Sequence, residues 1–299
     1  MKVIRRHIVG ELVEEVRLSD FVVEQFEEIP SRSAAKKKIK KGVIRVDGEP
    51  KSSADWVDTG QVIELLEEEL KLLKAYHLDF EIIYEDVYLA IVNKPAGIPV
   101  SGNQFKTMQN AIIGKLEVSK ESDRLNWPKP VHRLDAPTSG LLVFAKTSNA
   151  IMKLGQLFEN KQIKKVYHAI VMGDIDESGK MDDKLEGKAA LTYFKRLSQV
   201  SSLRNQLLSW VEVYPQTGRT HQIRKHLSKQ GFPIMGDQLY GDDGNVYKGK
   251  GLFLCAVGLE FQHPMTDQPL NIKIKAPNKF DLLMTREKRR WDKYHNPEE

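Results

Sequence analysis

A cluster of polar residues near the middle of the chain carries side chains that could act as a base or a nucleophile. His132, Arg133 and Asp135 stand just ahead of the segment 136–140, APTSG, which has the composition of a turn. Residues 141–145 form a continuous apolar run, which predicts a strand buried on both faces. We therefore expect Asp135 on a loop held by a rigid strand, where working residues are often found. A capping or turn-forming carboxylate is the ordinary alternative.

A second dense cluster of polar residues lies between positions 215 and 227, PQTGRTHQIRKHL. Gly218 allows a turn, and Thr220 is predicted to cap a helix that begins at His221. Arg219 stands just outside this helix and Arg224 inside it. Two arginines in a helical segment are often only a surface pair of little energy, so charge alone does not assign them a role.

Two other kinds of site can be excluded from the same residues. His221 and His226 are five residues apart, so they would point away from each other on a helix, whereas zinc pairs at a spacing of four share one face. Ser139, His132 and Asp135 do not form a hydrolase triad, because the chain has no GxSxG elbow and Ser139 follows Pro-Thr. We expect neither a metal site nor a hydrolase.

Short strands and a few helices must position these clusters. The segment 80–93 carries two extended stretches and leads into KPAGIPV, a rigid loop. The segment 161–173, KQIKKVYHAIVMG, predicts a strand that contains Tyr167, which alone would be read as a core residue. Ser148 is predicted to cap a helix over 148–158. Because no βαβ pattern repeats, we predict an α+β domain with a mixed, largely antiparallel sheet.

The first seventy residues predict a separate small module. A helix from Leu18, with Ser19 as its N-cap, precedes a second helix that Ser31 caps and Gly42 ends. Asp-Gly at 47–48 then marks a hairpin. The second helix is strongly basic and could bind a phosphate backbone, although such a run is often only a solvated face. The residues that could contact such a backbone are Arg32, Lys36, Lys37, Lys40 and Lys41.

Composition sets broad limits on the protein class. A chain of 299 residues suggests one large domain or two unequal ones, and a net charge of +5 leans weakly toward a polyanionic partner. Cys255 is the single cysteine, so an internal disulfide is excluded and a reducing compartment is expected; within its apolar run it is predicted to be buried. With no signal peptide and no long apolar run, we expect a cytoplasmic protein.

Several motifs together resemble the RluA type of pseudouridine synthase. The resemblance rests on HRLD followed by TSG, on KPAG, on KKVY, on TGRTHQIRKH and on GDQLYG, which occur in the family's order. The N-terminal module resembles the S-four RNA-binding domain through Ser31-Arg32-Ser33, Ile39, Gly42, Val46 and Gly48. The resemblance implies the pseudouridine synthase fold and an RNA substrate, more often ribosomal RNA than tRNA.

The resemblance also implies roles for single residues. Asp135 would be the catalytic carboxylate, Arg219 the cation that pairs with it, and Tyr167 the surface on which the flipped base stacks. Arg133 would fill the gap that the base leaves. The other residues that we assign to substrate binding are His132, Thr138, Thr220, Gln222 and Arg224. The reaction needs no redox step or group donor, so no cofactor is expected.

The predicted organisation has five parts. They are an N-terminal extension over 1–17, the S-four-like module over 18–68, a linker over 69–79, the catalytic domain over 80–285 and a charged tail over 286–299. We expect a monomer. Three alternatives stay open: a tRNA pseudouridine synthase, a non-catalytic RNA-binding protein on the same fold, and a binding module with no RNA partner.

Overall fold

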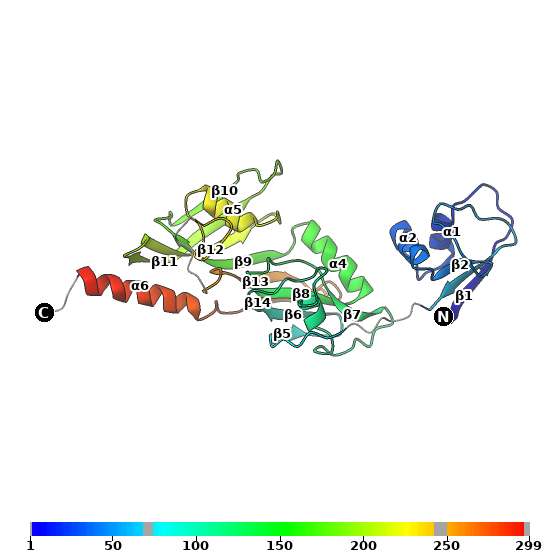
Figure 1. Ribbon diagram of the computed structural model, residues 1–299, viewed down its shortest axis with the longest axis horizontal. Coiled ribbons are helices and arrows are strands. Elements are labelled where there is room, and N and C mark those ends of the chain that lie inside the picture. The colour runs from blue at the N-terminus through cyan, green and yellow to red at the C-terminus, as the bar shows by residue number, and fades with distance from the viewer. Residues whose placement is uncertain (1, 68–73, 242–249, 296–299) are drawn as a thin grey trace. The chain divides into compact units, whose positions relative to one another are not determined.

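The structure is a computed structural model that describes residues 2–67, 74–241 and 250–295. The chain divides into two compact units, Met1–Leu72 (unit 1) and Leu73–Glu299 (unit 2), each of which is described by itself (Figure 1). No helix among the described residues is both long enough and apolar enough to cross a membrane.

Unit 1 is a four-stranded antiparallel sheet with two helices. Its elements are β1 (Val3–Ile8), α1 (Leu18–Gln25), α2 (Arg32–Lys40), β2 (Ile44–Val46), β3 (Glu49–Pro50) and β4 (Val62–Leu66). The strand order is β1-β4-β2-β3. Because β1 pairs with β4, residues 1–17 are not an extension outside the module but supply an edge strand of its sheet.

The local sequence explains where α2 of unit 1 begins and ends, but not the N-cap of α1. The Ser31 hydroxyl accepts a hydrogen bond from the backbone N–H of Ala34 and so caps α2, as predicted. Gly42 follows α2 with φ 71°, which a glycine adopts without strain. The predicted helix from Leu18 is present as α1, but the predicted N-cap was wrong, because the N-cap is Arg17 and Ser19 lies buried in the first turn.

Unit 2 contains one large sheet and four helices in its described residues. Its elements are β5 (Glu81–Glu85), β6 (Leu89–Lys94), α3 (Met108–Ala111), β7 (Arg124–Pro130), β8 (Ser139–Thr147), α4 (Ser148–Glu159), β9 (Lys164–Met172), β10 (Ser178–Met181), β11 (Thr192–Ser202), β12 (Gln206–Pro215), α5 (Gln222–Lys229), β13 (Leu254–Gln262), β14 (Pro269–Lys273) and α6 (Lys279–His295). Thr147 rather than Ser148 caps α4, because the helix already begins at Ser148.

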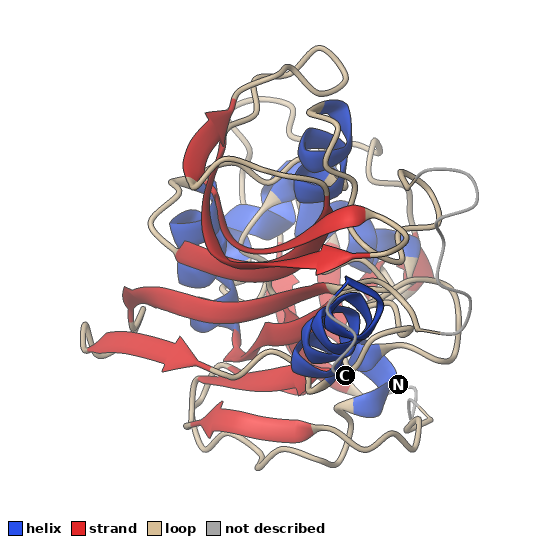
Figure 2. Cartoon of the chain, turned by 90° about the vertical axis from the view of Figure 1, so that its left-hand side faces the viewer, coloured by secondary structure: helices blue, strands red, loops and turns tan. Residues whose placement is uncertain are grey.

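The ten-stranded sheet is mixed and largely antiparallel, as predicted. Its main path is β10-β11-β12-β9-β13-β8-β6-β5, with β14 paired to β13 and β7 paired to β8. Figure 2 draws the strands in red and the helices in blue. The β8–β13 pair is parallel and joins the two halves of the sheet. The loop that carries Asp135 leads into β8, so the central strands of the sheet fix its position.

Glycine at position 140 is required where β8 and β13 run parallel. Gly140 has φ 110°, and a Cβ built there would lie 2.2 Å from the carbonyl oxygen of Ala256. We expect Gly140→Ala to lower the free energy of unfolding by at least about 2 kcal/mol, from backbone strain and overpacking together. Urea unfolding measures this, with Gly155→Ala in α4 as a stabilising control. An unchanged midpoint for Gly140→Ala would contradict the close approach.

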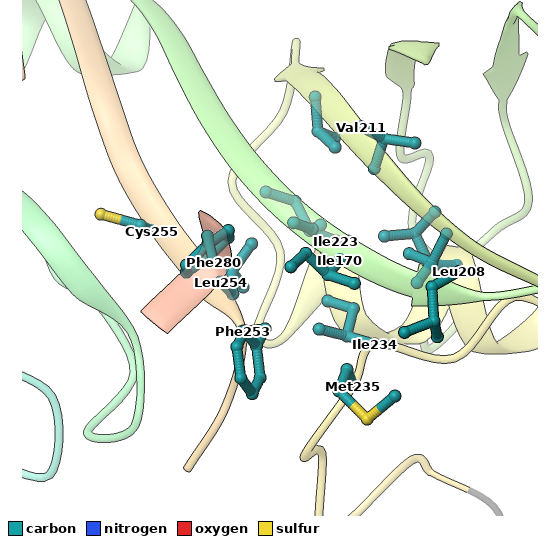
Figure 3. Close-up of a cluster of buried hydrophobic side chains, with 14 of the residues drawn as sticks. Ile170, Leu208, Val211, Ile223, Ile234, Met235, Phe253, Leu254, Cys255 and Phe280 are labelled. Carbon is teal, nitrogen blue, oxygen red and sulfur yellow. The ribbon is translucent and has the colours of Figure 1, made fainter. Parts of the chain in front are cut away.

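The principal apolar core of unit 2 lies against β9, β12 and β13. Ile170, Val211 and Leu254 come from these three strands and pack with Phe280 of α6 (Figure 3). Cys255 is buried in the same cluster, which confirms the prediction for it. The predicted end of the domain at 285 was wrong, because α6 continues to His295. Glu287 of α6 is buried and accepts a hydrogen bond from Ser202 at 2.7 Å, so residues up to 295 belong to unit 2.

Candidate active site

Backbone and side-chain contacts tie down the loop that carries Asp135. The carbonyl oxygen of Ala136 accepts hydrogen bonds from the backbone N–H of Gly97 at 2.7 Å and from Lys94 Nζ at 3.1 Å. The Thr138 N–H donates to the Asp135 carbonyl oxygen at 3.0 Å. Burial lowers the pKa of Lys94 to about 8, while the nearby Asp135 acts to raise it. These contacts hold the loop in place at Ala136, next to Asp135.

The Asp135 carboxylate lies between a guanidinium and an imidazole. Arg224 Nη1 is 3.3 Å from Oδ2, and His221 Nε2 is 3.6 Å from Oδ1. Arg224 is itself held by two hydrogen bonds of 2.7 Å to Asp237, whose side chain is fully buried. Tyr240 packs its ring against Arg224 and places its hydroxyl 2.9 Å from His221 Nδ1. The carboxylate is thus fixed in orientation and faces a positive charge.

The cation beside Asp135 is Arg224, not the predicted Arg219. Arg219 Nε donates to the carbonyl oxygen of Ala189 at 3.1 Å instead. The cause lies in the backbone, because His221 has φ 56° and turns the chain sharply between Arg219 and the helix. Arg224 stands in the first turn of α5, and its guanidinium reaches the carboxylate.

The segment before α5 also differs from prediction at two polar residues. Thr220 does not cap the helix, because the N-cap is His221 and no side chain caps it. Gln222 is buried, and its amide donates to the Thr192 hydroxyl at 2.9 Å and accepts from the Thr217 hydroxyl at 2.6 Å. These bonds hold the turn before α5, and Gln222 also lines the first cavity described next. Thr220 does line the cavity described next.

Two cavities meet at Asp135. The first has a volume of about 540 Å³, and the second of about 650 Å³. Arg133, Asp135 and Arg224 line both cavities, while Tyr167 lines only the first. Burial, and then the neighbouring Asp135, raise the pKa of Tyr167, so its ring stays an uncharged phenol. Arg133 is exposed at the junction. The predicted Asp135, Arg133 and Tyr167 are therefore brought together, on β9 and on the loop before β8 (Figure 1).

Comparison with known proteins points to one family. A family model described as RNA pseudouridylate synthase matches residues 88–229. Ribosomal large subunit pseudouridine synthase C from Vibrio parahaemolyticus is 31% identical over 298 residues, covering 90% of this chain and 91% of that protein. tRNA pseudouridine synthase C from the same organism is 32% identical over 237 residues, covering 70% of this chain and 95% of that protein. This chain belongs to the RNA pseudouridylate synthase family.

Solved structures agree on the fold of this synthase. Human RNA Pseudouridylate Synthase Domain Containing 1 superposes with a TM-score of 0.56 and 23% identity, covering 67% of this chain and 84% of that one. The predicted α+β pseudouridine synthase fold is thereby confirmed. Family membership makes the chain an isomerase that converts uridine in RNA to pseudouridine. The segment matched by the family model contains Asp135, Tyr167 and Arg224.

His132 and Thr138 of this synthase both line the first cavity, as their assignment to substrate binding requires. His132 Nε2 accepts a hydrogen bond from the backbone N–H of Val143 at 3.0 Å, and its ring stacks on Phe158 with centroids 4.7 Å apart. Burial, and then the neighbouring Lys165, lower the pKa of His132 to about 3, so it is neutral. Thr138 is buried, and its hydroxyl has no hydrogen-bond partner among the described residues.

Sequence reasoning left four residues of the site without a role. Asp237 and Tyr240 belong to the quoted segment GDQLYG, and Lys94 to KPAG, so the signal was present as motifs. His221 was weighed only as a zinc ligand. Among the residues that the structure describes, no group of three His, Cys, Asp or Glu side chains could hold a metal ion.

Proposed function

We propose that this synthase modifies uridine in large-subunit ribosomal RNA and that Asp135 is its catalytic carboxylate. The observation that carries the residue role is the placement of Asp135 at the junction of two cavities, opposite Arg224 and on the same cavity wall as Tyr167. A paired uridine cannot be reached inside a stem, so the nucleotide must leave its stack before reaction.

Each group in the cavity then has a task. The uracil ring stacks on Tyr167, a contact worth roughly 1–3 kcal/mol per base. Asp135 acts at the sugar–base junction as a nucleophile or a base, and Arg224 holds the carboxylate charged and oriented. Arg133 is exposed at the mouth and fills the space that the base leaves. The bond from C1′ to N1 breaks, the bond from C1′ to C5 forms, C5 loses its proton to a base, and N1 gains a proton from solvent. No electron or external group is consumed, so the proposal includes no cofactor.

Coverage of the relatives supports ribosomal RNA over tRNA. Unit 2 is about three quarters of the chain, so the 90% alignment with the ribosomal enzyme must extend into unit 1. The alignment with the tRNA enzyme covers 95% of that enzyme but only 70% of this chain. That share of the chain is smaller than the share that unit 2 makes up. The alignment with this ribosomal relative therefore includes part of unit 1, for which an RNA-binding role fits.

The basic face of α2 is the RNA-binding surface that we propose for unit 1. The exposed residues on it are Lys36, Lys37, Lys40 and Lys41. Arg32, predicted with them, is exposed as well but forms an ion pair with Asp20. Buried Ala35 and Ile39 attach the opposite face of α2 to the unit 1 core. The lysines therefore project from a fixed helix, which suits contact with phosphates.

Neutralising this surface should weaken RNA binding in a salt-dependent way. In Lys36→Gln/Lys37→Gln/Lys40→Gln, the slope of log affinity against log salt concentration should fall by about one for each lost phosphate contact. The control Lys273→Gln/Lys275→Gln removes exposed charges at and just after the end of β14 in unit 2. It should leave the slope unchanged. Filter binding to ribosomal RNA at several salt concentrations measures both. An unaltered slope in the triple variant would exclude α2 from phosphate contact.

Pseudouridine mapping tests the RNA class. Ribosomal RNA and tRNA from cells that lack the gene are compared with those from wild-type cells, which we propose hold the protein as a cytoplasmic monomer. Loss of one or more pseudouridines from large-subunit ribosomal RNA, restored by the wild-type gene, is the expected result. Loss confined to tRNA would favour the alternative substrate, and intact pseudouridines in both would favour a binding protein on the same fold.

A further inference from the structure

Lys165 shares a cavity wall with Tyr167. Both residues lie on β9, and residues two apart in a strand point to the same side of the sheet. Both line the first cavity. Their separation along the strand is about 6.6 Å, which is comparable to the reach from a pyrimidine ring to its own phosphate.

The ammonium of Lys165 lacks a hydrogen-bond or ion-pair partner of the kind that three other lysines of this chain have. It is partly buried, yet its side-chain ammonium forms no hydrogen bond or ion pair with any residue that the structure describes. By contrast, buried Lys94 donates to two backbone carbonyl oxygens, and buried Lys146 pairs with Glu85 at 2.7 Å. The adjacent Lys164 is exposed and pairs with Glu260 at 2.8 Å.

The surroundings of Lys165 would favour a bound anion. Burial lowers its pKa, and no neighbouring carboxylate offsets this. Asp135 is engaged by Arg224, and Glu159, the other carboxylate of the same cavity, forms no ion pair with Lys165. A partly buried ammonium without a counter-charge destabilises the protein. A bound anion would supply the counter-charge and remove this cost.

We propose that Lys165 binds a backbone phosphate of the RNA strand whose uridine enters the cavity. This rests on the proposed function, in which the uracil ring stacks on Tyr167. A phosphate is the anion that every nucleotide brings, whereas uracil itself offers only neutral carbonyl oxygens. The cavity mouth is cationic as well, because Arg133, Lys161 and Arg219 line it. Lys165 thus fixes the depth to which the flipped nucleotide enters.

Replacing Lys165 should lower activity on RNA without lowering the stability of the protein. Lys165→Met deletes an unpaired charge and keeps the apolar stem, so the melting temperature should stay equal or rise. A structural lysine would show the opposite, and a clear fall in melting temperature would overturn the inference. Lys164→Met is the matched control, because it removes the neighbouring charge outside the cavity.

Kinetics on RNA supply the second readout. For Lys165→Met we expect kcat/KM to fall roughly ten- to a hundredfold, the range for losing one charged hydrogen bond. The slope of log kcat/KM against log salt concentration should fall by about one, and Lys165→Arg should restore it. Lys164→Met should keep kcat/KM near the wild-type value. Unchanged kinetics or slope in Lys165→Met would overturn the inference.

Failure of the proposed function would look different. A wild-type protein that modifies neither ribosomal RNA nor tRNA would contradict that function rather than the phosphate contact. The same salt titration would then be run on equilibrium binding of single-stranded RNA. A slope equal in wild type and Lys165→Met would overturn the contact, and a smaller slope in the variant would support it.

Discussion

We expect the Asp135→Asn protein to fold and to bind RNA as the wild type does, and to form no measurable pseudouridine. Asparagine has the same shape as aspartate but can act neither as a nucleophile nor as a base at the sugar–base junction. Loss of this carboxylate, which Arg224 holds at 3.3 Å, should lower kcat by about 10⁴-fold or more.

The fold should survive this change for a structural reason. Arg224 keeps both 2.7 Å hydrogen bonds to Asp237 when Asp135 is neutral, so no buried charge is left alone. The lost contact spans 3.3 Å and should cost about 1 kcal/mol. Thermal unfolding checks stability and single-turnover kinetics check the reaction, with exposed Asp176→Asn as control. Turnover within tenfold of wild type would remove Asp135 from its role.

Arg224→Gln should give the largest loss of stability among the site variants. The substitution leaves Asp237 fully buried without its counter-charge, which costs about 3–5 kcal/mol. The backbone N–H groups of Leu239 and Tyr240 still donate to Asp237, so the protein should remain partly folded at low temperature. Its kcat should fall at least about a hundredfold beyond the loss of folded protein, because Asp135 is no longer held in place.

Arg219→Gln is the matched control for this prediction, since Arg219 is the arginine that the family resemblance implied as the partner of Asp135. Among the described residues its side chain makes one hydrogen bond, to the backbone of Ala189, so its removal should change the free energy of unfolding by less than about 1 kcal/mol. Urea unfolding with activity measured at matched folded fractions compares the two. Equal losses in both variants would contradict the pairing of Arg224 with Asp135.

The sequence was most informative where the determining contacts are local. Asp135 was placed correctly because a turn and an apolar run flank it, and Tyr167 because the strand pattern around it is continuous. The capping of α2 by Ser31 depends on residues three apart, so the sequence displays it directly. The mixed, antiparallel sheet followed from the alternation of short strands with few helices.

The errors concern contacts that depend on distant residues or on backbone conformation. Arg219 and Arg224 look alike as charges, and the left-handed backbone of His221 decides which of them reaches the carboxylate. Residues 1–17 were predicted to be an extension outside unit 1, because the pairing of β1 with β4 joins positions about sixty residues apart and leaves no local signal. Asp237 was quoted within a motif, but only folding brings it against α5.

Tritium release tests the central claim most directly. Ribosomal RNA and tRNA transcripts, deproteinised and labelled with tritium at carbon 5 of uracil, are incubated separately with the wild type and with Asp135→Asn. The account predicts release from ribosomal RNA by the wild-type protein and none by the variant, because carbon 5 loses its proton only when the new glycosidic bond forms there. Equal release by both proteins would contradict the role of Asp135, and no release by the wild type from either RNA would contradict the proposed activity on free RNA.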